Sequence, residues 1–157
     1  MFKNTDHLHS DEIKLSLTYT SEARPEKGWL PAYYFDICLL DGTAIGTCDL
    51  RLGHNERSYI GGNIGYGVKR KYRGHRYAAK ACKLLFGLAQ EHGMDYLIIT
   101  CDINNIASIR TCEICGGEFL GIEDVPLDDN SFVWLGKKNR IYRFDLTQEV
   151  YCPGLGN

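Results

Sequence analysis

Alternating apolar and polar residues follow a polar beginning of the chain. Residues 13–20 repeat with a period of two, which predicts a half-buried strand. Residues 33–40 form an aromatic and aliphatic run, and the pair Asp41 and Gly42 after it is a strong hairpin signal. Residues 43–52 then make the returning strand. The first third of the sequence therefore predicts antiparallel strands.

A glycine-laden strand and a helix come next. Residues 53–57 are expected to form a loop and residues 58–68 a strand, whose glycines indicate a bulge or a close approach to the backbone. From Arg76 to His92 the apolar residues follow helical spacing, and Gly93 is a natural stop. The pattern therefore changes from strand to helix in the middle of the chain.

The last third of the chain contains a buried strand, a capped helix and two further strands. Residues 96–101 are a continuous apolar run, which suits a strand buried on both faces. Asn104 and Asn105 can cap a second helix that runs to about Cys115. The last strands are expected at 119–125 and 132–146, with a turn at 126–131 between them.

The order of elements predicts the fold class α/β (α+β), with one mixed sheet of about seven strands. The strand–helix–strand unit at 58–101 should be a right-handed crossover between parallel strands, while the other strands can pair antiparallel. We expect a single domain over 13–146, a flexible N-terminus over 1–12 and a C-terminal tail over 147–157.

Composition and charge exclude several classes of protein. A chain of 157 residues suits one domain, and its net charge of −2 lacks the basic excess of a nucleic-acid binder. No stretch approaches the roughly 20 apolar residues that cross a bilayer, and the N-terminus lacks the apolar core of a signal peptide. We therefore expect a cytoplasmic protein without a nucleic-acid or membrane partner.

Seven cysteines are an odd number, and most of them lie inside apolar runs. Reduced, buried thiols are the expected state in a cytosolic chain. Cys112 and Cys115 have the spacing of a redox or zinc pair, but no second ligand pair follows, and they fall near the end of a helix. We expect no metal site.

The segment between the glycine-laden strand and the central helix carries the candidate chemistry. Free backbone N–H groups at a helix start, together with the helix dipole, bind phosphate well. The turn consists of Arg73, Gly74, His75, Arg76, Tyr77 and Ala78. Further positive charge comes from Lys69, Arg70 and Lys71. The segment fits neither a P-loop nor a Rossmann glycine pattern, and the alternative is a solvated basic surface loop.

At this turn the sequence resembles the GNAT family of N-acetyltransferases, whose pyrophosphate signature is Gln/Arg-x-x-Gly-x-Gly/Ala. Arg73 fills the first position of the signature and Ala78 the last, while Arg76 stands where the family usually has glycine. Downstream, Asn105 and Ser108 resemble the family's Asn-x-x-Ser/Ala motif. The resemblance covers about residues 33–145.

The resemblance implies acetyl-CoA as the acetyl donor and a primary amine, on a small molecule or a protein, as the acceptor. The acetyl oxygen needs a backbone N–H as charge develops, and the family position falls at Tyr66, Gly67 and Val68. The pantetheine amides would pair with the same strand edge. Only residues 21–30 link the first two strands, where the family usually has one or two helices. The acceptor site is therefore open, or is completed by residues 151–157 or by a neighbouring subunit in a homodimer.

The catalytic acid and base are less well defined by the resemblance. The family's usual proton donor is a tyrosine seven residues after the motif asparagine, and that position holds Cys112, which can donate a proton or simply pack. Candidate bases are Asp102, Asp49 and Glu56, and Asp102 could equally form a turn or a helix cap. Two alternatives to an enzyme stay open: a non-catalytic acyl-CoA-binding module, and a metal or redox protein built on the cysteines.

Overall fold

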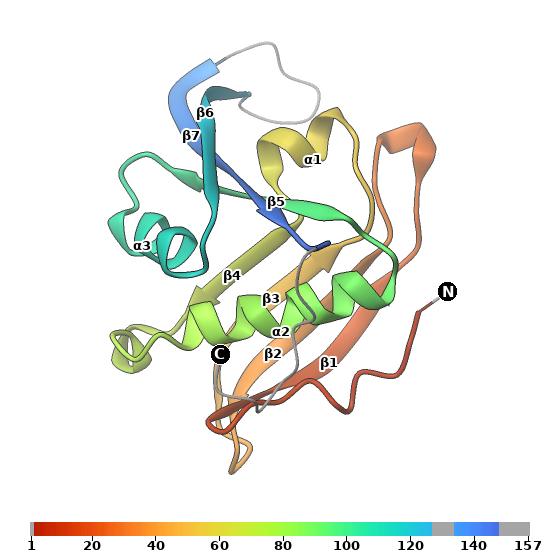
Figure 1. Ribbon diagram of the computed structural model, residues 1–157, viewed down its shortest axis with the longest axis vertical. Coiled ribbons are helices and arrows are strands. Elements are labelled where there is room, and N and C mark those ends of the chain that lie inside the picture. The colour runs from red at the N-terminus through yellow and green to blue at the C-terminus, as the bar shows by residue number, and fades with distance from the viewer. Residues whose placement is uncertain (1, 127–133, 148–157) are drawn as a thin grey trace.

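The computed structural model describes residues 2–126 and 134–147, which form seven strands and three α-helices (Figure 1). The strands are β1 (Ile13–Ser21), β2 (Ala32–Leu39), β3 (Ala44–Arg51), β4 (Ile64–Val68), β5 (Tyr96–Asp102), β6 (Glu118–Pro126) and β7 (Trp134–Asp145). The helices are α1 (Glu56–Gly61), α2 (Tyr77–Glu91) and α3 (Ile106–Ile114), with single 3-10 turns η1 (Pro25–Lys27) and η2 (Arg70–Tyr72). The predicted α/β class and the seven strands are confirmed.

The strands divide into two antiparallel sheets, with the orders β1-β2-β3-β4 and β5-β7-β6. In the described residues, β4 and β5 share no ladder, so the expected parallel pairing of one mixed sheet is absent there. Figure 1 shows the two strands close together near α1 and diverging toward α3. We call the opening between them the β4–β5 splay.

Asn63 joins the two strands at the closed end of the splay. Its N–H donates to the C=O of Ile98 (2.6 Å), and its side-chain oxygen accepts from the Ile98 N–H (2.9 Å). Its side-chain NH₂ donates to the C=O groups of Arg51 (3.0 Å) and Gly53 (2.7 Å). The side chain is fully buried, and both its oxygen and its nitrogen are hydrogen-bonded. The two hydrogen bonds between Asn63 and Ile98 therefore take the place of backbone pairing between β4 and β5 at this end.

The helix α1 corrects the expected loop at 53–57 and the first part of the strand expected at 58–68. The Asn55 side chain accepts from the Ser58 N–H (2.8 Å), and the Ser58 hydroxyl accepts from the Asn55 N–H (2.9 Å). This reciprocal capping box starts a helix that Gly62 ends at a φ of 83°. The strand is therefore only Ile64–Val68, and the extra glycines belong to the helix end.

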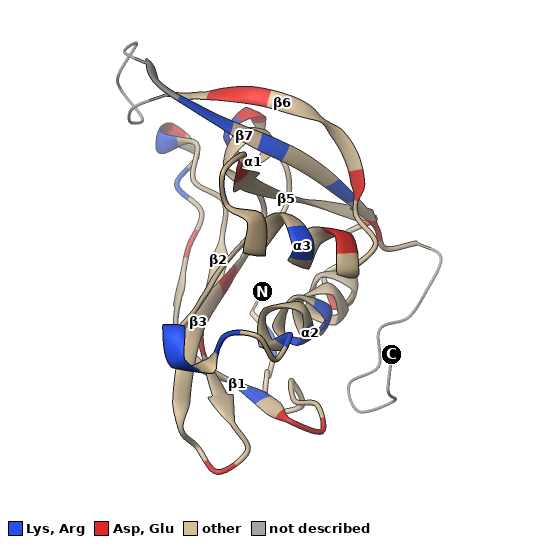
Figure 2. Ribbon diagram, turned by 90° about the vertical axis from the view of Figure 1, so that its left-hand side faces the viewer, with Lys and Arg blue, Asp and Glu red and all other residues tan. Residues whose placement is uncertain are grey.

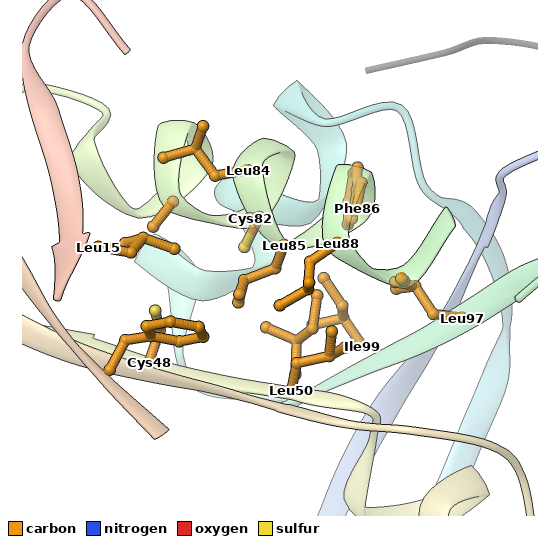
Figure 3. Packing of buried hydrophobic residues seen from close by; sticks show 14 of the residues in the cluster. Leu15, Cys48, Leu50, Cys82, Leu84, Leu85, Phe86, Leu88, Leu97 and Ile99 are labelled. Carbon is orange, nitrogen blue, oxygen red and sulfur yellow. The ribbon is translucent and has the colours of Figure 1, made fainter. Parts of the chain in front are cut away.

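The helix α2 confirms the predicted helix at 76–92 and covers one face of the β1–β4 sheet (Figure 2). Apolar residues three and four apart place one helical stripe against the strands. Figure 3 shows side chains of this stripe directed toward β3 and β5. The contacting residues are Cys82, Leu85 and Leu88 on α2, Cys48 and Leu50 on β3, and Ile99 on β5.

The N-terminal segment, expected to be flexible from its polar composition, packs on this core. Leu8 is buried, and the Lys3 N–H donates to the hydroxyl of Tyr33 (2.7 Å). His7 pairs with Glu91 at the end of α2 (2.8 Å). The flexibility of the segment stays a prediction. The tail from 148 onward and most of the turn expected at 126–131 lie outside the described residues.

The six cysteines of the described part form no disulfide bond with one another. Cys38, Cys48, Cys82, Cys101 and Cys112 are buried and Cys115 is partly exposed, while Cys152 lies outside the described residues. None of the helices within 2–126 and 134–147 has the length and apolar character that crossing a membrane requires.

Candidate functional site

The turn from Arg73 to Ala78, in front of α2, presents a run of backbone N–H groups. Those from Gly74 to Ala79 have no hydrogen-bond partner among the described residues, and the first bond into the helix is Lys80 N–H to Arg76 C=O (3.1 Å). The Arg73 Nε–H donates to the C=O of Val68 (2.8 Å) and ties the turn to the end of β4. The turn therefore offers unsatisfied donors at the positive end of the helix dipole, the usual elements of an anion site.

Arg76, which stands where the family usually has glycine, has a backbone conformation that favours glycine. Its φ of 63° and ψ of 23° lie in the left-handed region, where no other described non-glycine residue has a positive φ. An L-residue pays about 1–2 kcal/mol for this conformation. The fold therefore keeps the glycine-type turn despite the arginine, and the Arg76 side chain is exposed.

Positive charge gathers around the turn. Figure 2 shows lysine and arginine on the loop that leads into α2. The sequence from Arg57 to Gln90 contains no aspartate or glutamate. Lys69, Arg70, Lys71, Arg73 and Arg76 are all exposed. The unpaired N–H groups thus lie in a local field that attracts an anion.

The edge of β4 that faces the splay also carries N–H groups that have no hydrogen-bond partner within residues 2–126 and 134–147. Directly after β4, the Lys69 N–H donates to the C=O of Ile45 on the β3 side (2.8 Å). Antiparallel pairing alternates, so Gly67 also points its backbone groups toward β3. The N–H groups of Tyr66 and Val68 therefore face the splay. Of the sequence-predicted positions, Tyr66 and Val68 direct their N–H groups into the splay, whereas Gly67 directs its N–H group toward β3.

A cluster of polar and thiol side chains lies at the wide end of the splay, where α3 packs. The hydroxyls of Tyr66 and Ser108 lie 2.7 Å apart, and Asn105 caps α3 by accepting from the Ser108 N–H (3.1 Å). Cys112 is fully buried beside them, and its hydrogen bond with Cys101, together with burial, raises the pKa of its thiol. Burial likewise raises the pKa of Tyr66. Both groups therefore keep their protons at neutral pH.

The candidate carboxylates lie in different surroundings. Asp102 ends β5, and its side chain accepts a hydrogen bond from the Asn104 N–H (2.8 Å). This bond stabilises a turn, the alternative role expected for Asp102. Glu56 is exposed in the first turn of α1. Asp49 pairs with Arg51 (3.0 Å) and accepts from the Gly65 N–H (3.2 Å). Of these three, Asp49 is the one in direct contact with the backbone of β4.

A groove of about 1110 Å³ lies on the side of the β1–β4 sheet away from α2. Its walls come from the β1–β2 link, α1 and the β6–β7 pair. They include Tyr19, Arg24, Trp29, Tyr34, Arg51, Glu56, Gly62 and Asn139. The link is short, as predicted, and holds the single turn η1. Sequence reasoning missed this groove because its walls come from segments far apart in the chain.

The comparisons with known proteins agree with this geometry. A family model described as an acetyltransferase (GNAT) domain matches residues 4–118, most of the chain. The protein therefore belongs to the GNAT acetyltransferase family. A comparison with curated protein sequences finds no significant match.

Solved structures of acetyltransferases share the fold. The microcin C7 self-immunity acetyltransferase, in complex with acetyl-CoA and AMP, has 19% identity and a TM-score of 0.57 over 73% of this chain and 61% of its own. The ribosomal-protein-S5-alanine acetyltransferase of Vibrio fischeri has 13% identity and a TM-score of 0.59 over 74% and 63%. A ribosomal L7/L12 alpha-N-protein acetyltransferase has 15% identity and a TM-score of 0.56 over 77% and 72%. The chain thus spans less than two thirds of the first two structures, and these likenesses show the fold.

Proposed function

We propose that the protein transfers an acetyl group from acetyl-CoA to a primary amine. The observation that carries this proposal is the run of unpartnered N–H groups from Gly74 to Ala79 at the open end of the β4–β5 splay. The CoA pyrophosphate would accept these N–H groups, as phosphates do at helix starts. Its pantetheine arm would run along β4 to the free N–H groups of Tyr66 and Val68. Family membership supports the same donor.

The chemistry of acetyl transfer sets three requirements on this site. The thioester oxygen needs a donor as the tetrahedral intermediate forms, and the Tyr66 N–H faces the splay for that role. The alkylamine, whose pKa is ~10, must lose a proton before it attacks. The CoA thiolate must gain one, and the hydroxyls of Tyr66 and Ser108 lie beside its path. Catalytic roles for Cys112 and Asp102 stay predictions, and their burial and turn bonding favour structural roles.

A second candidate function is a non-catalytic acyl-CoA-binding module of the same fold. The observation that favours it is Cys112, which fills the usual position of the acid and is fully buried. Such a module would bind acetyl-CoA as tightly as an enzyme but would not release the thiol when amines are added. Turnover with amines therefore separates the two candidates.

Ligand-dependent melting followed by a thiol-release assay tests the proposal. Acetyl-CoA at 100 times its Kd should stabilise the protein by about 2.7 kcal/mol, whereas NAD at the same concentration should not. Thiol release should then appear with at least one member of a panel of polyamines, aminoglycosides, amino-acid amides and short peptides. Stabilisation without thiol release across the panel would favour the binding module. No stabilisation would contradict both candidates.

The identity of the acceptor, as a small molecule or a protein, the cytoplasmic location and a homodimer stay predictions. Relatives in the fold comparison include an enzyme named for microcin self-immunity and enzymes named for ribosomal proteins. Both kinds of acceptor are compatible with a groove that is open on one side of the sheet.

A further inference from the structure

A row of directly opposed residues crosses all four strands of the β1–β4 sheet. Tyr19 on β1 pairs with Tyr34 on β2, Tyr34 with Asp49 on β3, and Asp49 with Gly65 on β4. The neighbours of Tyr34 on β2 and of Asp49 on β3 lie in the core beneath α2, so Tyr34 and Asp49 lie on the opposite face of the sheet. The Tyr19 ring stacks on Tyr34 and therefore lies on that face as well. The row begins in the groove and ends at the backbone of β4.

Gly65 makes room for the Asp49 carboxylate against β4. A Cβ atom at Gly65 would lie 2.9 Å from Oδ2 of Asp49, closer than side chains tolerate. The other oxygen, Oδ1, accepts the Gly65 N–H at 3.2 Å. The Gly65 N–H therefore holds the Asp49 carboxylate over β4 by a hydrogen bond, and the lack of a side chain at Gly65 leaves room for it. Its side chain is still 20% exposed, so a small molecule can reach it.

The surroundings of Asp49 favour a charged but proton-accepting carboxylate. Burial raises the pKa of Asp49, while Arg51 at 3.0 Å and the Gly65 N–H lower it, and the net shift is upward. A carboxylate with a raised pKa accepts a proton more readily than an ordinary one, and Arg51 and the Gly65 N–H stabilise its ionised form. Arg51 also lines the groove, so the ion pair orients Asp49 at the groove's edge.

Asp49 lies next to the position proposed for the thioester. The residue after Gly65 is Tyr66, whose N–H faces the splay. Since consecutive Cα atoms are about 3.8 Å apart, an amine nitrogen between Asp49 and that N–H can reach both, directly or through one water. Asp102, by contrast, lies across the splay on β5 and is bonded to its own turn.

The other half of the row is aromatic. The rings of Tyr19 and Tyr34 stack with centroids 4.3 Å apart and planes 11° apart, and Tyr19 is 57% exposed. Adjacent strands are about 4.8 Å apart, so the two rings lie roughly one and two strand spacings from Asp49. A flat group attached to an amine can therefore lie on the tyrosines while its nitrogen reaches the carboxylate.

We propose that the row Tyr19, Tyr34, Asp49 and Gly65 is the acceptor track, in which Asp49 is the catalytic base and the tyrosine pair holds a flat group carried by the amine. This inference rests on the proposed acetyl transfer. Asp49 takes one proton from the acceptor's ammonium group. The neutral nitrogen then attacks the thioester carbon, the C–N bond forms and the C–S bond breaks. The thiolate leaves with the electron pair and gains the second nitrogen proton, and Asp49 releases its proton to water.

Comparing benzylamine with aniline as acceptors shows whether Asp49 acts as a base or has only a structural role. Both amines carry a phenyl ring, but only benzylamine is a cation at neutral pH. Asp49→Asn should lower kcat/KM for benzylamine by about 100-fold or more, as loss of a general base does. It should change kcat/KM for aniline by less than about threefold, because that amine needs no prior deprotonation. The Kd for acetyl-CoA, measured by melting, should not change.

One variant is a control, and a second tests the tyrosine pair. Asp36→Asn changes a carboxylate on β2 of the same face, opposite Thr47, and should leave both amines unaffected. Tyr19→Ala removes the exposed ring and should raise KM for benzylamine about fivefold with kcat unchanged. Equal losses for the two amines in Asp49→Asn, or no loss, would overturn the role of Asp49. A wild-type protein that binds acetyl-CoA but acetylates neither amine would overturn the acceptor track, whereas failure to bind acetyl-CoA would overturn the proposed function itself.

Discussion

Replacing Gly74 with valine is expected to lower the affinity for acetyl-CoA by at least about 100-fold. Gly74 has a φ of 92° and is exposed, in the turn that holds the unpartnered N–H groups. A β-branched residue avoids this φ strongly, so the turn must change its conformation. Hydrogen bonds to a charged group contribute about 1.5–3 kcal/mol each, so the loss of two amounts to a factor of about 100 or more. Isothermal titration with acetyl-CoA measures the change.

Gly93→Val is the matched control for this variant. Gly93 follows the other end of α2 and has a φ of 76°, and a Cβ atom added at either glycine would have no neighbouring atom within 4 Å. The 15 residues of α2 place Gly93 about 20 Å from the turn. Both variants should lose stability through backbone strain, but only Gly74→Val should lose acetyl-CoA binding. Equal affinities in the two variants would refute the assignment of the 73–78 turn.

Replacing Asn63 with alanine is expected to destabilise the protein by about 4 kcal/mol. The side chain satisfies the C=O groups of Arg51 and Gly53 and the N–H of Ile98 at a site without solvent access. Each buried group left unsatisfied costs about 1–3 kcal/mol. Because Asn63 joins β3, β4 and β5, its loss should also loosen the closed end of the splay.

Urea denaturation gives the free energy of unfolding for this comparison. Asn104→Ala, at an exposed turn position, is the control and should change stability by less than about 0.5 kcal/mol. A loss of less than about 1 kcal/mol in Asn63→Ala would mean that packing of α2, rather than Asn63, holds the two sheets together.

Local sequence signals predicted the elements whose pattern is strong. The period of two at 13–20, the apolar run at 96–101 and the helical spacing at 76–92 each predicted the right element, although in β1 only Ile13 and Leu15 are buried. Helix α1 was missed because its cap pairs Asn55 with Ser58 and uses serine in place of the usual glutamate. The division of the sheet depends on one buried amide, Asn63, which has no spacing signal.

The candidate site also has one part that local sequence predicts and another part that depends on contacts between distant residues. The 73–78 turn was predictable because a helix start and its preceding loop are adjacent in sequence. The contact between Tyr66 and Ser108 and the alignment of Asp49 with Gly65 join residues far apart in the chain. Such contacts depend on strand register and on how α3 docks, which the order of residues does not encode locally. The sequence therefore did not distinguish Asp49 from the other two candidate bases, whereas the strand register shows that Asp49 lies over β4.

The location of bound acetyl-CoA tests the central claim most directly. A crystal structure of the complex should place pyrophosphate oxygens about 3 Å from N–H groups between Gly74 and Ala79, with the pantetheine arm along β4. The thioester oxygen should lie at the same distance from the Tyr66 N–H. Acetyl-CoA bound outside the β4–β5 splay, with these N–H groups still unpartnered, would contradict the account.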